Sequence, residues 1–196
     1  MENVVNLART DSKLSPTIVV FGQKELFSKQ PYRLHQYPKV QDQFMTNNDV
    51  FTRLRYMFNY SDAELVTIFA AADLEVPQTQ VAHWLTGEEN PDHVEMRDPE
   101  LASFLNGLIN ERRGKKPGAQ PVPEKRLNNN IIARKLKIAL NLQGQDMIMI
   151  LALADFNLSN HELSAFFRKK GHTHYRNMND QVLRYLLRGL QLEIRP

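Results

Sequence analysis

The stretch DPELASFLNGLINERR at residues 98–113 returns near the end of the chain as DQVLRYLLRGLQLEIR at residues 180–195. The correspondence extends without a gap, at one constant offset, over residues 47–113 and residues 129–195. A shared frame of this length predicts one fold built twice. Features present in both copies are then architectural, and features that differ between the copies are candidates for function.

Each copy shows the spacing of four amphipathic helices. In the first helix the apolar positions Val50, Leu54, Met57 and Phe58 fall on one stripe of a helix. The only strand-like segment is the short β-prone run Thr17–Phe21, and no longer segment alternates apolar and polar residues. The sequence therefore predicts an all-α protein made of two tandem copies of a four-helix unit. The predicted helix starts are Asn48 or Asn130, Ser61 with Glu64, Pro77 or Ser159 with Glu162, and Asp98 or Asp180.

Glycine recurs inside a helix, where it is unfavourable. Gly107 and Gly189 stand inside the fourth helix, where glycine costs about 1 kcal/mol relative to alanine. They indicate a close backbone approach, and we expect the two fourth helices to cross there and to relate the copies by a pseudo-twofold axis.

The second helix of the second copy is apolar nearly all round, so we expect it to be central.

The second and third helices of each copy resemble a helix-turn-helix pair. At the turn position usually occupied by glycine stand Glu75 and Asn157, of which only asparagine readily accepts a left-handed backbone. Asp73 and Asp155 end the second helix, where the helix dipole disfavours negative charge. Each is expected to hydrogen-bond the following turn or to pair with Arg113 or Arg195.

Composition divides the chain into four segments: residues 1–44, repeat 1 at residues 45–113, a Pro- and Gly-rich semi-stiff linker at residues 114–127, and repeat 2 at residues 128–196. Residues 1–44 have no counterpart in the repeat. They are either an upstream extension before a natural start at Met45 or a mostly disordered tail whose apolar run docks elsewhere.

Several function classes are excluded or disfavoured by composition. The chain has 0 Cys, which removes disulfides and thiol chemistry, and it has no apolar run of the ~18 residues that a membrane span requires. Every recurring acid has a capping or ion-pair explanation, which disfavours acid–base catalysis. His172 and His174 could share a metal, but no spacing supplies a third ligand. We expect a non-enzymatic protein without catalytic, cofactor or metal sites.

Charge distinguishes the two copies sharply. Residues 45–113 hold 5 Lys/Arg against 12 Asp/Glu, whereas residues 128–196 hold 10 against 5. The contrast is strongest in a loop of equal length after the third helix. In repeat 1 this loop carries Glu88, Glu89, Asp92 and Glu95. In repeat 2 it carries Arg168, Lys169, Lys170, His172, His174, Tyr175 and Arg176. Because the length is kept while the sign changes, packing does not select these charges.

Two hypotheses from different classes follow, beside the interpretation that both loops are simply solvated. In the first, the basic loop and the outward residues Asn160, His161 and Ser164 of the third helix contact phosphates of DNA or RNA, while Tyr175 stacks on a base. In the second, the acidic loop of one repeat pairs with the basic loop of another, which makes a scaffold or a homo-oligomer.

From Met45 onward the chain resembles the YehS-like family of uncharacterised bacterial proteins, a tandem domain of unknown function. The resemblance rests on NNDV at residues 47–50, SFLNGLI at residues 103–109, LNNNI at residues 127–131 and LRYLLRGL at residues 183–190. It covers about three-quarters of the chain. It implies a cytoplasmic bacterial protein, and it supplies no activity, cofactor or site residue.

Overall fold

Eight helices follow one another in residues 44–195, the part of the chain that the computed structural model describes. Repeat 1 forms α1 (Asn47–Phe58), α2 (Asp62–Ala71), α3 (Gln78–Leu85) and α4 (Asp98–Arg113). Repeat 2 forms α5 (Asn129–Ala139), α6 (Gly144–Leu153), α7 (Asn160–Phe167) and α8 (Asp180–Ile194). These residues contain no strand, so the prediction of a duplicated all-α fold is confirmed. The run Thr17–Phe21 and residues 1–43 lie outside the described residues.

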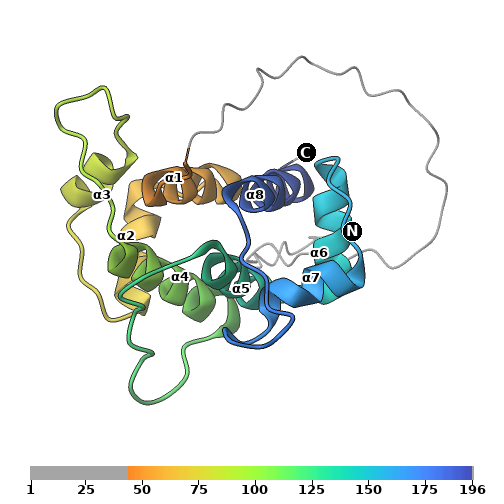
Figure 1. The fold of residues 1–196 in the computed structure, drawn as a ribbon. Helices are drawn as coiled ribbons and strands as arrows, with labels where there is room; N and C mark the ends of the chain where they lie inside the picture. The colour runs from red at the N-terminus through yellow and green to blue at the C-terminus, as the bar shows by residue number, and fades with distance from the viewer. Residues whose placement is uncertain (1–43, 196) are drawn as a thin grey trace, which may run out of the picture. The chain divides into compact units, whose positions relative to one another are not determined.

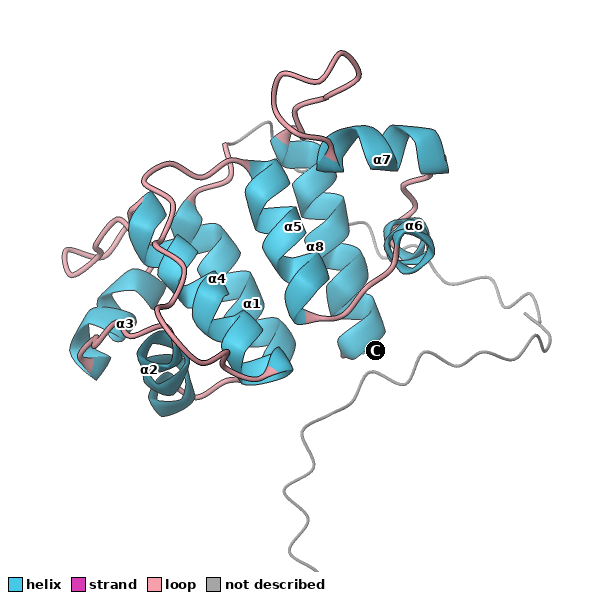
Figure 2. Ribbon diagram, turned by 90° about the horizontal axis from the view of Figure 1, so that it is seen from below, coloured by secondary structure: helices cyan, strands magenta, loops and turns pink. Residues whose placement is uncertain are grey.

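The two repeats share a middle layer of helices. α1, α4, α5 and α8 lie side by side, α4 against α5 and α8 against α1, as Figure 2 shows. The pair α2–α3 and the pair α6–α7 lie on opposite sides of this layer (Figure 1). Each outer pair packs on the fourth helix of its own repeat, because α2 contacts α4 and α6 contacts α8. The arrangement leaves α3 and α7, with the loops that follow them, at the two ends.

Side-chain capping explains where five of the helices begin. Ser61 and Ser159 cap α2 and α7 in capping boxes with Glu64 and Glu162, as predicted. The predicted starts of the first and fourth helices are wrong. Their N-cap residues are Thr46 and Asn128 for α1 and α5, and Arg97 and Asn179 for α4 and α8. The residues taken for caps lie one or two positions inside the helix, where their side chains reach other elements.

Asn48 and Asn130 bridge three segments of their own repeat. The buried amide of Asn48 donates to the carbonyl oxygens of Trp84, at 2.8 Å, and Val94, at 2.9 Å, and its oxygen accepts from the N–H of Met96 at 2.9 Å. Asn130 makes the same three bonds in repeat 2, at 2.8, 2.8 and 2.9 Å. The first helix is thereby tied to the end of the third helix and to the loop after it. Asparagine recurs here because it supplies both donor and acceptor.

Asp98 and Asp180 join the repeats reciprocally. Asp98 of repeat 1 accepts at 2.9 Å from the N–H of Leu127, just before repeat 2 begins. Asp180 of repeat 2 accepts at 3.0 Å from the N–H of Met45, the first residue of repeat 1. Each copy holds the start of the other through the same residue, which is the relation that a pseudo-twofold produces.

The recurring glycines mark a close approach within each repeat, and the predicted crossing of the two fourth helices is wrong. A Cβ on Gly107 would lie 1.8 Å from the carbonyl oxygen of Ile68 in α2. A Cβ on Gly189 would lie 1.9 Å from the carbonyl oxygen of Ile150 in α6. The helix that excludes a side chain is therefore the second helix of the same copy.

The connection between the second and third helices departs from the expected turn. It spans residues 72–77 in repeat 1 and residues 154–159 in repeat 2. The left-handed residues are Asp73, with φ 59°, and Asp155, with φ 60°, rather than Glu75 or Asn157. Aspartate tolerates this conformation better than most residues, which accounts for its recurrence. Asp73 pairs with Lys115 and not with Arg113, while Arg195 donates to the carbonyl oxygen of Tyr56 at 2.9 Å.

The cores of the two repeats differ in chemistry. Repeat 1 contains an aromatic cluster of Phe51, Phe69, Trp84 and Phe104, with ring centroids 4.9–6.2 Å apart. In repeat 2 the corresponding core residues are mainly aliphatic. The expectation that α6 is central is wrong, because Met149 and Leu153 on its outer side are 47% and 43% exposed.

Within residues 44–195 no single helix is long and apolar enough to cross a membrane. α5 and α6 reach the required length and apolar character only as a pair, and that pair is bent by 109°.

Candidate nucleic-acid interface

Helix α7 presents its polar face to solvent because its apolar face is anchored. Leu163, Ala165 and Phe166 are buried, with Phe166 held further by the bond from Asn130 to its carbonyl oxygen. The predicted contact residues of this helix, Asn160, His161 and Ser164, are all exposed. The Oγ of Ser164 donates to the carbonyl oxygen of His161 at 2.8 Å, so this hydroxyl is partly occupied by its own helix.

The basic loop, residues 168–177, folds back beside α7. The N–H of His172 donates to the carbonyl oxygen of Lys169 at 3.0 Å, and the N–H of Tyr175 donates to that of His172 at 2.8 Å. The N–H of Arg176 then donates to the carbonyl oxygen of Ala165 at 3.1 Å, which returns the loop to the helix. These three hydrogen bonds therefore give the loop a defined backbone conformation.

Three histidines from this loop and from α7 gather on one surface. The ring centroids of His161 and His174 are 6.5 Å apart, and those of His172 and His174 are 5.8 Å apart. The structure thus brings together sequence-predicted residues from two segments. Within residues 44–195, no group of three His, Asp or Glu side chains is placed to hold a metal ion.

The cations beside these histidines form no close ion pair within residues 44–195, although the charge of Arg176 acts on Glu162 and helps to lower its pKa. Arg168, Lys169, Lys170 and Arg176 form no ion pair with a carboxylate among the described residues. Lys169, Lys170 and Arg176 are exposed, and Arg168 is half-buried. Tyr175 is also half-buried, so only part of its ring is open to a partner.

Arg134 in α5 completes this cluster, and sequence reasoning missed it. Its Nη2 donates to the carbonyl oxygen of Phe167 at 2.9 Å, which places the guanidinium at the C-terminal end of α7. The only signal in the sequence was a basic residue off the apolar stripe of α5. We call Arg134, Arg168, Lys169, Lys170 and Arg176 the basic surface.

Glu162 is a negative charge that interacts electrostatically with Arg176 of this surface. The backbone N–H and the hydroxyl of Ser159 donate to its carboxylate at 3.0 and 2.7 Å, and these bonds lower the pKa of Glu162. The carboxylate is therefore ionised near neutral pH and occupies the N-terminus of α7. A phosphate would be repelled by this carboxylate and attracted by Arg134 and by the cations of the loop.

Repeat 1 contains an equivalent loop that carries the opposite charge. In the acidic loop, residues 87–95, the N–H of Asn90 donates to Gly87, that of His93 to Asn90 and that of Val94 to His83, at 3.0, 2.9 and 3.3 Å. These are the counterparts of the three bonds that shape the basic loop. Its predicted partner residues Glu88, Glu89, Asp92 and Glu95 are all exposed and form no ion pair among the described residues.

Comparison with known proteins places the chain by family. The family described as a protein of unknown function (DUF1456) matches residues 47–114 and residues 129–195. The chain is 41% identical over 147 residues to the uncharacterized protein YehS of Escherichia coli (strain K12), an overlap that covers 74% of this chain and 94% of that protein. No solved structure matches. The chain belongs to the DUF1456 family, whose matched unit it contains twice, once in each four-helix repeat.

Proposed function

We propose that this chain is a non-enzymatic cytoplasmic binding module that takes up nucleic acid on the basic surface of repeat 2. The observation that carries the proposal is the pair of loops with the same backbone bonds and opposite charge. Since the acidic loop is held by the same bonds, folding does not require the cations of the basic loop. These cations are not needed for folding and form no ion pair with a carboxylate among the described residues. They are therefore suited to binding phosphate groups.

The geometry favours contact with the backbone of the nucleic acid. Lys169, Lys170 and Arg176 are exposed within one short turn, and Arg134 and Arg168 extend the positive charge toward the C-terminal end of α7. The exposed His172 and His174 add rings on which bases could stack. Recurring carboxylates such as Asp98 and Asp180 are engaged in structural bonds, which supports binding rather than catalysis.

Salt dependence tests this proposal. The full chain should bind a fluorescent 24-mer, offered as duplex DNA or as single-stranded RNA. With about four phosphates neutralised, its affinity should fall about 100-fold between ~50 and ~200 mM salt. The double substitution Lys169→Glu and Lys170→Glu should abolish binding, whereas Lys116→Glu and Lys125→Glu, which change the net charge equally in the linker, should not. Absence of binding at the lower salt refutes the proposal.

A second candidate is association of copies through the two loops. It is favoured by the four exposed, unpaired carboxylates of the acidic loop, which match the basic loop in length and oppose it in charge. Glu88→Lys with Glu89→Lys should break such an oligomer, and adding Lys169→Glu with Lys170→Glu should restore it. Sedimentation at low and high salt measures this. A monomer in every variant at every salt concentration excludes this candidate.

A further inference from the structure

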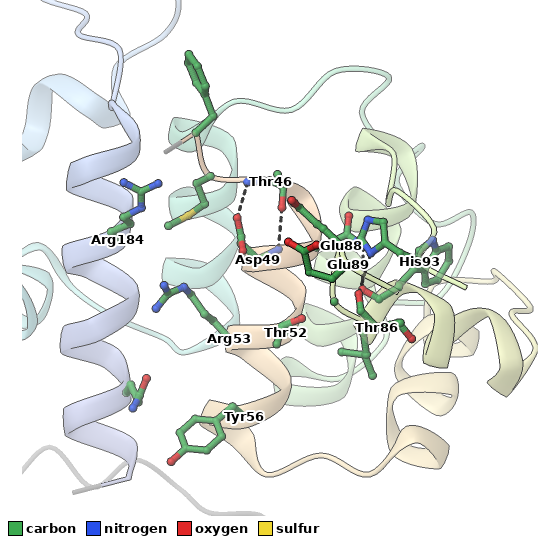
Figure 3. A pocket seen from close by; sticks show the side chains of 17 residues that line it. Thr46, Asp49, Thr52, Arg53, Tyr56, Thr86, Glu88, Glu89, His93 and Arg184 are labelled. Carbon is green, nitrogen blue, oxygen red and sulfur yellow. Dashed lines mark hydrogen bonds between the residues drawn. The ribbon is translucent and has the colours of Figure 1, made fainter. Parts of the chain in front are cut away.

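The described residues contain a groove between α1 and α8 that neither repeat fills. It has a volume of about 1270 Å³, and the helical residues that line it include Thr52, Arg53 and Tyr56 of α1, Arg184 and Gln191 of α8, and the end of α3. Figure 3 shows the side chains of Arg53 and Arg184 extending into it from the two facing helices. At one rim stands part of the acidic loop.

The corresponding position between α4 and α5 is occupied by the linker. Asn110 donates to the side chain of Gln120 at 2.7 Å, and Asn106 donates to the carbonyl oxygen of Pro121 at 3.3 Å. Glu124 then pairs with the buried ammonium of Lys135 at 2.9 Å, before Leu127 bonds to Asp98. A short extended segment thus lies along two helices, with one carboxylate placed on one cation.

The groove between α1 and α8 retains two of these features. Asp180 holds the N–H of Met45 at 3.0 Å, as Asp98 holds that of Leu127. Arg53 stands at the position in α1 that Lys135 occupies in α5. Unlike Lys135, Arg53 forms no ion pair with a carboxylate among residues 44–195. Arg184, which replaces the small Ala102, adds a second cation.

We propose that the α1–α8 groove is a binding site for an extended segment of a partner protein that carries one carboxylate, which pairs with Arg53 and Arg184. The ion pair between Glu124 and Lys135 is an example of this arrangement within the same chain. A guanidinium binds a carboxylate through two parallel hydrogen bonds, so two arginines suit this group better than the single lysine does.

Charge distribution favours a peptide over a nucleic acid at this site. Asp49, Glu88 and Glu89 line the same groove, and their carboxylates would repel a run of phosphates. A peptide needs only one acidic residue at Arg53 and can place neutral or basic residues along the acidic rim. The site is separate from the basic surface, which lies on α5 and on the loop that follows α7.

The probe for this site is the octapeptide Gln-Pro-Val-Pro-Glu-Lys-Arg-Leu, the sequence of residues 120–127. Titrated into the isotope-labelled full chain, it should shift the amide signals of α1 and α8 and leave those of α7 in place. Replacing its glutamate by glutamine should weaken binding about tenfold, as should Arg53→Gln in the protein. Arg113→Gln, an exposed arginine outside the groove, is the matched control and should leave the affinity unchanged.

Three results would overturn the proposal. Equal affinity for both peptides, or an affinity that Arg53→Gln does not change, would show that the carboxylate does not contribute to binding. Displacement of the peptide by an equimolar oligonucleotide would assign the groove to nucleic acid. The residue that matches Glu124 in the repeat frame is Asp42, outside the described residues. Binding that appears only in an Asp42→Asn chain would assign the groove to this chain instead of a partner.

Discussion

Asn130 carries several structural connections at once. Its side chain is 3% exposed, and it bonds to the backbone of Phe166, Arg176 and Met178. No other residue type of similar size offers two donors and an acceptor in one plane. The same side chain therefore ends α7, fixes the exit of the basic loop and places the start of α8. The basic surface of repeat 2 is thus positioned by a buried residue.

Replacing Asn130 by alanine should destabilise the protein by about 2–4 kcal/mol, because buried backbone groups lose their partners. Urea unfolding measures this difference. Asn177→Ala is the control: Asn177 is exposed on the same loop and should change stability by no more than about 0.5 kcal/mol. An equal effect of both substitutions would show that the buried bonds do not hold the loop. If the proposed function is correct, Asn130→Ala should also weaken nucleic-acid binding under conditions in which the chain remains folded.

At the scale of the element, the capping box at the start of α7 links structure to pH. Ser159 donates to Glu162 through its N–H and its hydroxyl, so the folded protein favours the ionised carboxylate. The pKa of Glu162 in the folded chain is accordingly lowered from 4.5. A lowered pKa stabilises the folded state above the pKa of the unfolded chain, and this contribution is lost as the pH falls through the folded value. Acid therefore weakens the start of α7, while neutral pH preserves it.

Titration of the Glu162 side chain by NMR should give a midpoint below 4.5. Ser159→Ala should move that midpoint upward, because the hydroxyl no longer donates to the carboxylate. Ser164→Ala provides the control within the same helix, since its hydroxyl donates to the carbonyl oxygen of His161 instead. A midpoint that does not respond to Ser159→Ala would contradict the assigned cause.

For the molecule as a whole, the packing of α4 on α5 and of α8 on α1 makes the repeats interdependent. Lys135 of α5 is 8% exposed, and it bonds to Asn106 of α4 as well as to Glu124 of the linker. Separating the repeats would expose the ammonium of Lys135 to water. It would also break the hydrogen bonds that Asp98 and Asp180 accept from Leu127 and Met45. We therefore expect residues 44–195 to unfold in one cooperative transition.

The single tryptophan makes that expectation testable. Trp84 lies in the core of repeat 1 and is 3% exposed, so its fluorescence reports on that repeat alone. Gly189→Ala inserts a Cβ 1.9 Å from the carbonyl oxygen of Ile150 in repeat 2, which should cost about 1–3 kcal/mol. The Trp84 transition should shift together with the helical circular dichroism signal.

The matched control is Gly87→Ala, because a Cβ on Gly87 meets nothing within 4 Å. This substitution should leave both transitions in place. A Trp84 transition that stays fixed in Gly189→Ala, while helical signal is lost earlier, would show that the repeats unfold independently.

The sequence by itself determined the features that depend on neighbours along the chain. Apolar periodicity identifies the helices, and the Ser61 and Ser159 capping boxes set two starts, because each involves residues within one or two helical turns. The gapless duplication predicted one fold twice. The reversal of charge in the loop singled out Lys169 and Lys170, since the comparison between copies is itself contained in the sequence.

Only the tertiary structure decided which elements meet. Asn48 and Asp98 look like caps because asparagine and aspartate favour that position, yet their bonds reach residues distant in the sequence. Gly107 signalled a close approach but could not name α2 as its partner. Arg134 reaches the end of α7, and Arg53 extends into the groove between α1 and α8, only through the packing of whole helices. Periodicity records that a face is buried, whereas packing geometry alone selects what covers it.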